Sequence, residues 1–128
     1  APGRVLYEPD AGLIRAGALG TLCRQLDAHL FDPQIAYLVA PVWRADPRAQ
    51  AFAIEEVHPF SRKVVSQRMA AGKTGTVELK KRGFPAEPET LRSRLKLFKG
   101  GRPGVVIFTR RGDERLMIIG RRLTTMEE

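Results

Sequence analysis

The sequence is poor in the residues that build disulfide frameworks, metal sites and membrane spans. It contains one cysteine, Cys23, and two histidines, His29 and His58, in 128 residues. A single cysteine excludes an intrachain disulfide and favours a reducing, cytoplasmic location. The histidines lie far apart and have no neighbouring cysteines at ligand spacing, so we expect no zinc site. No uncharged apolar run approaches the roughly 18 residues of a membrane helix, and we expect no membrane partner.

Signatures of catalysis and of cofactor binding are also missing. There is no Gly-x-Ser-x-Gly nucleophile motif. Gly72-Lys73-Thr74 resembles the end of a phosphate loop, but Gln67 stands where that pattern requires glycine. The glycine-rich segment 100–104 precedes a predicted strand instead of opening a helix, as a dinucleotide cradle would. We therefore expect no catalytic residue, no metal and no cofactor site within this chain.

Positive charge is abundant, and its distribution is uneven. The formal net charge is +8. Residues 1–61 contain five basic and seven acidic side chains, whereas residues 62–122 contain seventeen Lys and Arg against five Asp and Glu. Such asymmetry is typical of a surface that binds a polyanion. The competing interpretation is a solvated surface that binds nothing.

The apolar pattern predicts an α/β (α+β) fold whose regular part covers residues 51–123. It indicates a strand at 52–57, a helix at 62–71 capped by Ser61, a strand at 76–82, a helix from Glu87 to about Leu97, and a hairpin with strands at 105–109 and 115–120. This β-α-β-α-β-β order predicts a small mixed sheet with helices packed on it. Residues 124–128 are predicted to be a tail.

Residues 1–50 are predicted to be a helical connector that packs on the core or on a catalytic domain outside this chain. Residues 5–7 read as a short strand, and Asp10 is a suitable N-cap for a helix that runs to about Leu26. The apolar stripe of that helix consists of Leu13, Leu19, Leu22, Cys23 and Leu26. An apolar piece at 35–39 and a loop at 41–47 follow.

The densest basic region follows the second predicted strand of the regular part. Strand alternation puts Val77 and Leu79 toward the core, with Lys80 and Arg82 on the opposite face. In the next predicted helix, three basic residues repeat at i, i+4 and i+7 beside an apolar row. Aromatic residues are few here, so we expect contacts with phosphates rather than with bases. The predicted nucleic-acid-binding residues are Lys80, Lys81, Arg82, Arg92, Lys96 and Lys99.

Three stretches of sequence, in this order, carry a resemblance to a known family. They are LYEPD at 6–10 with IRAG at 14–17, DPQIAYL at 32–38, and LKKRG at 79–83 followed by PETLR at 88–92. Together they resemble the THUMP-like C-terminal region of bacterial class I S-adenosylmethionine-dependent methyltransferases. The match covers most of residues 5–122.

The resemblance implies a THUMP-like fold, a catalytic domain upstream of Ala1 in the same polypeptide, and S-adenosylmethionine bound in that domain. THUMP domains deliver RNA to modification enzymes, so the implied partner is RNA, such as tRNA or rRNA. The predicted function is therefore an RNA-binding, non-catalytic domain of a methyltransferase. The alternative is a structural docking or oligomerisation module of the same enzyme that does not bind RNA.

Overall fold

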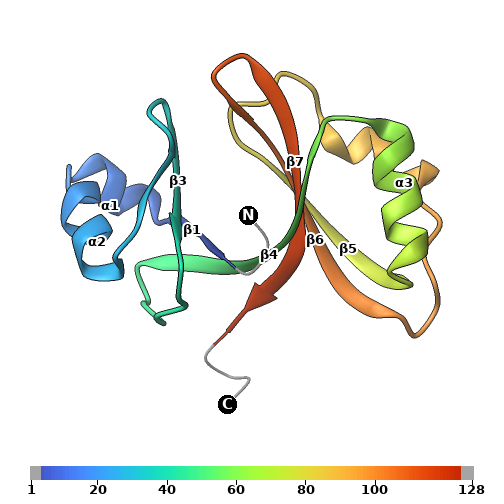
Figure 1. Ribbon diagram of the computed structural model, residues 1–128, viewed down its shortest axis with the longest axis horizontal. Helices are drawn as coiled ribbons and strands as arrows, with labels where there is room; N and C mark the ends of the chain where they lie inside the picture. The colour runs from blue at the N-terminus through green and yellow to red at the C-terminus, as the bar shows by residue number, and fades with distance from the viewer. Residues whose placement is uncertain (1–3, 125–128) are drawn as a thin grey trace. The chain divides into compact units, whose positions relative to one another are not determined.

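The computed structural model describes residues 4–124, which divide into two compact units (Figure 1). The first unit contains residues 4–55 and 122–124, and the second contains residues 56–121. Strand β4 (Ala49–Pro59) contributes its first part to the first unit and its last part to the second. No helix among residues 4–124 is long and apolar enough to cross a membrane.

The first unit is built from strands β1 (Val5–Pro9), β2 (His29–Asp32), β3 (Ile35–Ala40) and the start of β4, with helices α1 (Ala11–Arg15) and α2 (Leu19–Leu26). The strand order is β2-β3-β1-β4, and every pairing is antiparallel. In the register of the central strand, Tyr7 lies opposite Leu38 on one side and Ala51 on the other. The amino-terminal segment thus contains the predicted helical region and three strands.

The single helix predicted from Asp10 to Leu26 is wrong, because the chain forms two helices there. The break includes Gly17, which adopts a left-handed φ of +73° that other residues rarely adopt. Asp10 makes no side-chain capping bond. The apolar stripe still packs within this unit: Leu22 and Leu26 are buried in a cluster with β1, β3 and β4 residues, and Leu13, Leu19 and Cys23 are half-buried against it.

The second unit contains the end of β4, α3 (Arg62–Ala71), β5 (Thr74–Lys81), the 3-10 helix η1 (Pro88–Arg94), β6 (Arg102–Arg111) and most of β7 (Glu114–Leu123). Strand β6 pairs in parallel with β5 and antiparallel with β7, which confirms the predicted mixed sheet and its β-α-β-α-β-β order. The Ser61 cap is also confirmed, since its Oγ accepts a hydrogen bond of 3.1 Å from the Val64 N–H. Helix α3 and η1 pack on one sheet face through Val65, Met69, Leu91, Val106 and Phe108.

The second predicted helix of this region, from Glu87 to Leu97, is wrong in length and type. Only Pro88–Arg94 is helical, as a 3-10 helix, and the backbone of Leu95 is extended. The parallel pairing of β5 and β6 requires residues 82–98 to return from the end of β5 to its start. Arg92 donates to the Val77 carbonyl in the middle of β5, and the Phe98 N–H donates to the carbonyl of Thr74, its first residue. The residues after η1 therefore lead the chain to the start of β5 instead of continuing the helix.

Candidate nucleic-acid interface

The predicted basic residues at the end of β5 lie on alternating faces of the sheet, as expected. Val77 belongs to the apolar cluster under α3 and Leu79 packs against it, while Lys80 is half-buried on the other face. The Lys80 ammonium lies 3.9 Å from a carboxylate oxygen of Glu78. Lys81 is exposed at the strand end and pairs with Glu87 at 3.4 Å. Both ion pairs are at the surface, where such pairs exchange readily with water and with other anions.

Sheet register brings further basic residues to the same end of the second unit. Arg82 donates its N–H to the Phe108 carbonyl at 3.0 Å, so β5 ends beside the last residues of β6. On the other side of β6, Arg110 lies opposite Arg115 of β7. The Arg115 carbonyl in turn accepts a 2.9 Å bond from the N–H of Phe60, two residues before α3 begins. The end of β5, the first residue pairs of the β6–β7 hairpin and the residues just before α3 therefore lie close together.

We call this region the basic end. Its side chains come from four segments of the chain, and Glu78, Glu87, Asp113 and Glu114 are the acidic residues on the same segments. Arg62, Lys63, Lys81, Arg111 and Arg115 are exposed, and the other three members are half-buried. The basic end comprises Arg62, Lys63, Lys80, Lys81, Arg82, Arg110, Arg111 and Arg115.

An aromatic cluster lies beneath the basic end. The rings of Phe60 and Phe84 meet edge to face at 5.0 Å between centroids, and both contact Phe108. The Arg62 guanidinium lies 5.5 Å from the centre of the Phe60 ring. Phe84 and Phe108 are buried, so their faces are occupied by one another rather than offered to bases. The cluster fixes the strand ends from which the basic side chains project.

The other three predicted residues do not join the basic end. The expected helical row of Arg92, Lys96 and Lys99 does not form, because η1 ends at Arg94. Arg92 forms two hydrogen bonds to the Glu89 carboxylate, at 2.8 and 3.1 Å, and a third of 2.9 Å to the Val77 carbonyl. The hydrogen bonds and charge of Arg92 lower the pKa of Glu89. Lys99 follows Phe98, which is bonded to the first residue of β5, so it lies about 23 Å from the basic end.

A second polar cluster in this unit joins β4 to α3. Arg68 donates to both carboxylate oxygens of Glu56, at 2.9 and 3.1 Å, and His58 Nε2 lies 2.6 Å from the same carboxylate. These bonds, that of Arg68 above all, lower the pKa of Glu56. The arrangement is a surface ion pair that ties the helix to the strand. Within residues 4–124, no three His, Cys, Asp or Glu side chains come together as metal ligands.

The glycine-rich segment at 100–104 does not have the geometry of an S-adenosylmethionine cradle. The segment leads into strand β6, not into a helix. Its Gly101 is packed against backbone, since a Cβ there would lie 2.2 Å from the Lys73 carbonyl oxygen and 2.8 Å from the Gly75 nitrogen. Glycine is thus required here for the approach of two backbone segments. Cys23 is half-buried on α2, and burial raises the pKa of its thiol, which disfavours a nucleophilic thiolate.

Two features of the structure were not predicted from the sequence. Arg115 was not among the candidate residues, although its position at the start of a strand paired with Arg110 could have suggested it. The segment 41–47 is a loop, as predicted, but the sequence did not predict that four of its residues, Trp43, Ala45, Asp46 and Pro47, line a cavity in the first unit together with residues 49–51 and 122–124. The only sequence signal for this cavity is the single tryptophan, Trp43, within that loop.

Comparisons with known proteins agree with this architecture. The chain is 34% identical over 110 residues to two uncharacterised S-adenosylmethionine-dependent methyltransferases, one from each of two Mycobacterium tuberculosis strains, and covers 30% of their length. The crystal structure of a protein described as a methyltransferase from Porphyromonas gingivalis W83 shares the fold, with a TM-score of 0.71 and 24% identity over 97% of this chain and 30% of that one. The family described as THUMP domain-like matches residues 49–122. The chain therefore belongs to the THUMP domain-like family.

Proposed function

We propose that this chain is the RNA-binding part of an S-adenosylmethionine-dependent methyltransferase whose catalytic domain and cofactor site lie outside it. The observation that carries the proposal is the basic end, where four separate chain segments of the second unit, all with Lys or Arg side chains, lie near one another. The relatives with methyltransferase names are more than three times as long as the matched region, which leaves room for a catalytic domain. The low cysteine content suits a cytoplasmic enzyme.

The proposed mode of binding is contact with the phosphate backbone. Lys80, Lys81 and Arg82 project from a strand end held by the packed phenylalanine cluster, so their spacing is set by the sheet. Lys and Arg supply most protein contacts to phosphates, and these contacts position a nucleic acid without reading its sequence. Phe84 and Phe108 are buried, and the half-buried Phe60 has the Arg62 guanidinium over its ring, so base stacking contributes little at this end. We therefore expect the basic end to bind structured RNA with weak sequence preference.

The test compares two pairs of exposed basic residues in the same unit. The test variant carries Lys81→Ala and Arg111→Ala at the basic end, and the control carries Lys99→Ala and Arg102→Ala at the other end of β5. Both remove two positive charges, so non-specific electrostatics change equally. Binding of the 128-residue chain to tRNA is measured by filter retention at several salt concentrations. A variant that no longer reaches one phosphate should show a slope of log affinity against log salt that is flatter by about 0.7–0.9.

We expect the test variant to reduce that slope by between one and two units, and the control to change it much less. Equal effects of the two pairs would show that binding follows net charge and not the basic end. If the unmodified chain does not bind RNA even at low salt, the proposal fails. The docking or oligomerisation module then becomes the better explanation, and it predicts self-association or binding to a catalytic domain in sedimentation experiments.

A further inference from the structure

The first unit contains a cavity that the proposed function does not use. Its volume is about 480 Å³, within the range of about 300–1,000 Å³ found for small-molecule sites. Its apolar wall includes Trp43, Ala51 and Leu123. Its polar groups include the side chains of Asp46, Gln50 and Arg122. An apolar wall with a few fixed polar groups is the usual composition of a ligand site.

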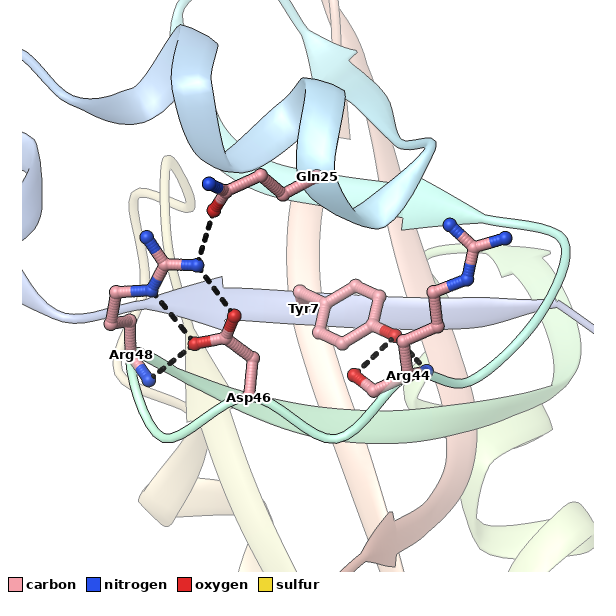
Figure 2. Close-up of polar contacts among 5 residues, drawn as sticks. All are labelled: Tyr7, Gln25, Arg44, Asp46 and Arg48. Atoms are coloured by element: carbon pink, nitrogen blue, oxygen red, sulfur yellow. Dashed lines mark hydrogen bonds and ion pairs between the residues drawn. The ribbon is translucent and has the colours of Figure 1, made fainter.

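One buried hydroxyl, that of Tyr7, is hydrogen-bonded to the backbone of Arg44 (Figure 2) and to that of Val42, the two residues on either side of Trp43. Tyr7 is fully buried in β1, and its Oη accepts a 2.7 Å hydrogen bond from the Arg44 N–H. The same hydroxyl is also the donor to two backbone carbonyls, that of Arg44 at 3.1 Å and that of Val42 at 3.5 Å. The indole of Trp43 also packs against the apolar cluster that contains Leu22. The indole that lines the cavity is therefore held in place without a ligand.

The other end of the loop is fixed by an ion pair (Figure 2). The Asp46 carboxylate accepts bonds from the Arg48 guanidinium at 2.6 and 2.9 Å and from the Arg48 N–H at 2.9 Å. Arg48 reaches further to the Gln25 side chain on α2. The side-chain hydrogen bond from Arg48 lowers the pKa of Asp46, so the pair stays charged at neutral pH. Arg48 thus balances the one negative charge on the cavity wall.

The positive charge on the wall belongs to Arg122. Its Nη1 donates to Gln50 Oε1 at 2.9 Å, and its guanidinium lies 4.9 Å from the centre of the Phe52 ring. These two contacts orient the guanidinium beside the apolar part of the cavity. A planar cation and an indole on one cavity wall fit a ligand that joins an anion to a flat ring.

We propose that this cavity binds a nucleoside monophosphate group, with the base against Trp43 and the phosphate at Arg122. The inference rests on the proposed function for the source of the ligand, which is then an unpaired nucleotide of the bound RNA; a free nucleotide offers the same chemistry. Gln50 and Asp46 supply polar atoms near the base edge. The first unit would then recognise a base, while the second holds phosphates.

Trp43 is the only tryptophan of the chain, so its fluorescence reports binding at this cavity directly. The 128-residue chain is titrated with AMP, UMP, adenosine, ribose 5-phosphate and a single-stranded RNA trinucleotide. We expect saturable quenching by AMP, UMP and the trinucleotide, weaker quenching by adenosine, and none by ribose 5-phosphate. Tighter binding of the trinucleotide than of AMP identifies RNA as the source. Equal affinity supports the site and overturns its assignment to RNA.

Variants that keep Trp43 separate the contacts. Arg122→Gln is expected to weaken AMP binding about tenfold, the equivalent of about 1.4 kcal/mol, and to leave adenosine binding unchanged. Arg24→Gln is the control, because Arg24 is an exposed side chain of the same unit outside the cavity. Ala45→Leu provides an independent test, since Ala45 is an exposed lining residue and a larger side chain there should block the cavity without disturbing the core.

Three results would overturn the proposal: no saturable quenching by any nucleotide, equal quenching by ribose 5-phosphate, or unchanged AMP affinity in both Arg122→Gln and Ala45→Leu. Its failure is distinguishable from failure of the RNA-binding proposal. If tRNA binding depends on Lys81 and Arg111 but nucleotides leave Trp43 unaffected, only the cavity proposal fails. If nucleotides quench Trp43 and tRNA binding does not depend on the basic end, the proposed function fails and the cavity remains a nucleotide site.

Discussion

The two units of this chain use their polar residues in different ways. In the first unit, the Tyr7 hydroxyl and the Asp46–Arg48 pair fix a loop, and a cavity remains beside it. In the second unit, the sheet face under α3 and η1 is filled by aliphatic and aromatic side chains, and the charged residues gather at its end. Residues 56–121 contain sixteen Lys and Arg against six Asp and Glu, whereas residues 1–55 contain five against six. The first arrangement suits a small ligand, and the second suits an extended polyanion.

Core substitutions should have the largest effects, and both units should respond. Phe108→Ala in the second unit is expected to cost about 3–5 kcal/mol, and Leu22→Ala in the first about 2–5 kcal/mol, because both side chains are fully buried. Since β4 is a strand of both units, we expect one cooperative transition. Urea unfolding followed by Trp43 fluorescence and by far-UV circular dichroism should give the same midpoint for each variant. Separate midpoints would show that the units unfold independently, and Val42→Ala, at an exposed site, serves as the neutral control.

Replacing one glycine in each unit by alanine should change the stability of the protein in opposite directions. Gly101→Ala in the second unit should destabilise by about 1–3 kcal/mol, because its Cβ would overlap the Lys73 carbonyl oxygen, a backbone atom. Gly20→Ala on α2 meets nothing closer than 3.7 Å and should stabilise by about 0.5–1 kcal/mol, since alanine favours a helix. Thermal unfolding of both variants tests the pair. A neutral Gly101→Ala would mean that the crossover after η1 shifts easily.

The sequence predicted the regular second unit better than the first, and the reason is physical. Periodicity and caps are local signals, so α3 was found at its true bounds and β5 within two residues of them. The closing hairpin, whose Gly112 supplies a left-handed φ of +59°, was found as well, but its strands β6 and β7 extend up to three residues beyond the predicted ends. The crossover after β5 was mispredicted because it must return along β5 and bond to Thr74 at its start, a constraint that depends on the parallel pairing of β5 and β6. Strand β3 lies in the apolar piece at 35–39, but no local pattern shows that it pairs with β1 on one side and with β2 on the other.

In the candidate site too, the sequence predicted what depends on neighbouring residues and missed what depends on long-range contacts. Lys80, Lys81 and Arg82 were identified because they are adjacent in the sequence and end a strand. Their grouping with Arg115 comes from sheet register, and their separation from Lys99 comes from the return of the chain to the start of β5. The cavity of the first unit depends on a hydrogen bond between residues 37 positions apart, from Tyr7 to Arg44. Such contacts can be found only once the fold is known.

The Tyr7 hydroxyl provides a test of the fixed loop in the first unit. Tyr7→Phe keeps the ring but removes the partner of the Arg44 N–H, and we expect a loss of about 1–3 kcal/mol. Burial raises the pKa of this hydroxyl, with the hydrogen bond from Arg44 opposing the shift. Its contribution to stability is therefore complete below the unfolded pKa of about 10 and is lost as the pH rises through the higher folded value. Tyr7→Phe should also shift the emission of Trp43 and weaken AMP binding. Tyr37→Phe, a second buried tyrosine, controls for the loss of a hydroxyl elsewhere.

The smallest expected effect on stability comes from breaking one ion pair in each unit, Glu56–Arg68 and Asp46–Arg48. Hydrogen bonds from Arg68, with a contribution from His58, lower the pKa of Glu56, and those from Arg48 lower the pKa of Asp46. A group whose folded pKa is lowered stabilises the protein fully above its unfolded pKa, about 4.3 for Glu and 3.9 for Asp, and loses that contribution as the pH falls through the folded value. Both carboxylates are partly solvated, so each pair should contribute only about 0.2–1 kcal/mol.

The stability lost when these carboxylates are protonated can be measured by urea unfolding at about pH 6 and at about pH 3, above and below their unfolded pKa values. Acidification also raises the net positive charge, which destabilises the whole chain and every variant alike. Glu56→Gln and Asp46→Asn should therefore lose less stability between the two pH values than the unmodified protein does, because their pairs are already absent. Asp10→Asn is the control, since that side chain makes no capping bond to α1. If Glu56→Gln and Asp10→Asn lose the same amount, the Glu56–Arg68 pair does not stabilise the second unit, and its ordered geometry follows from the packing of α3 alone.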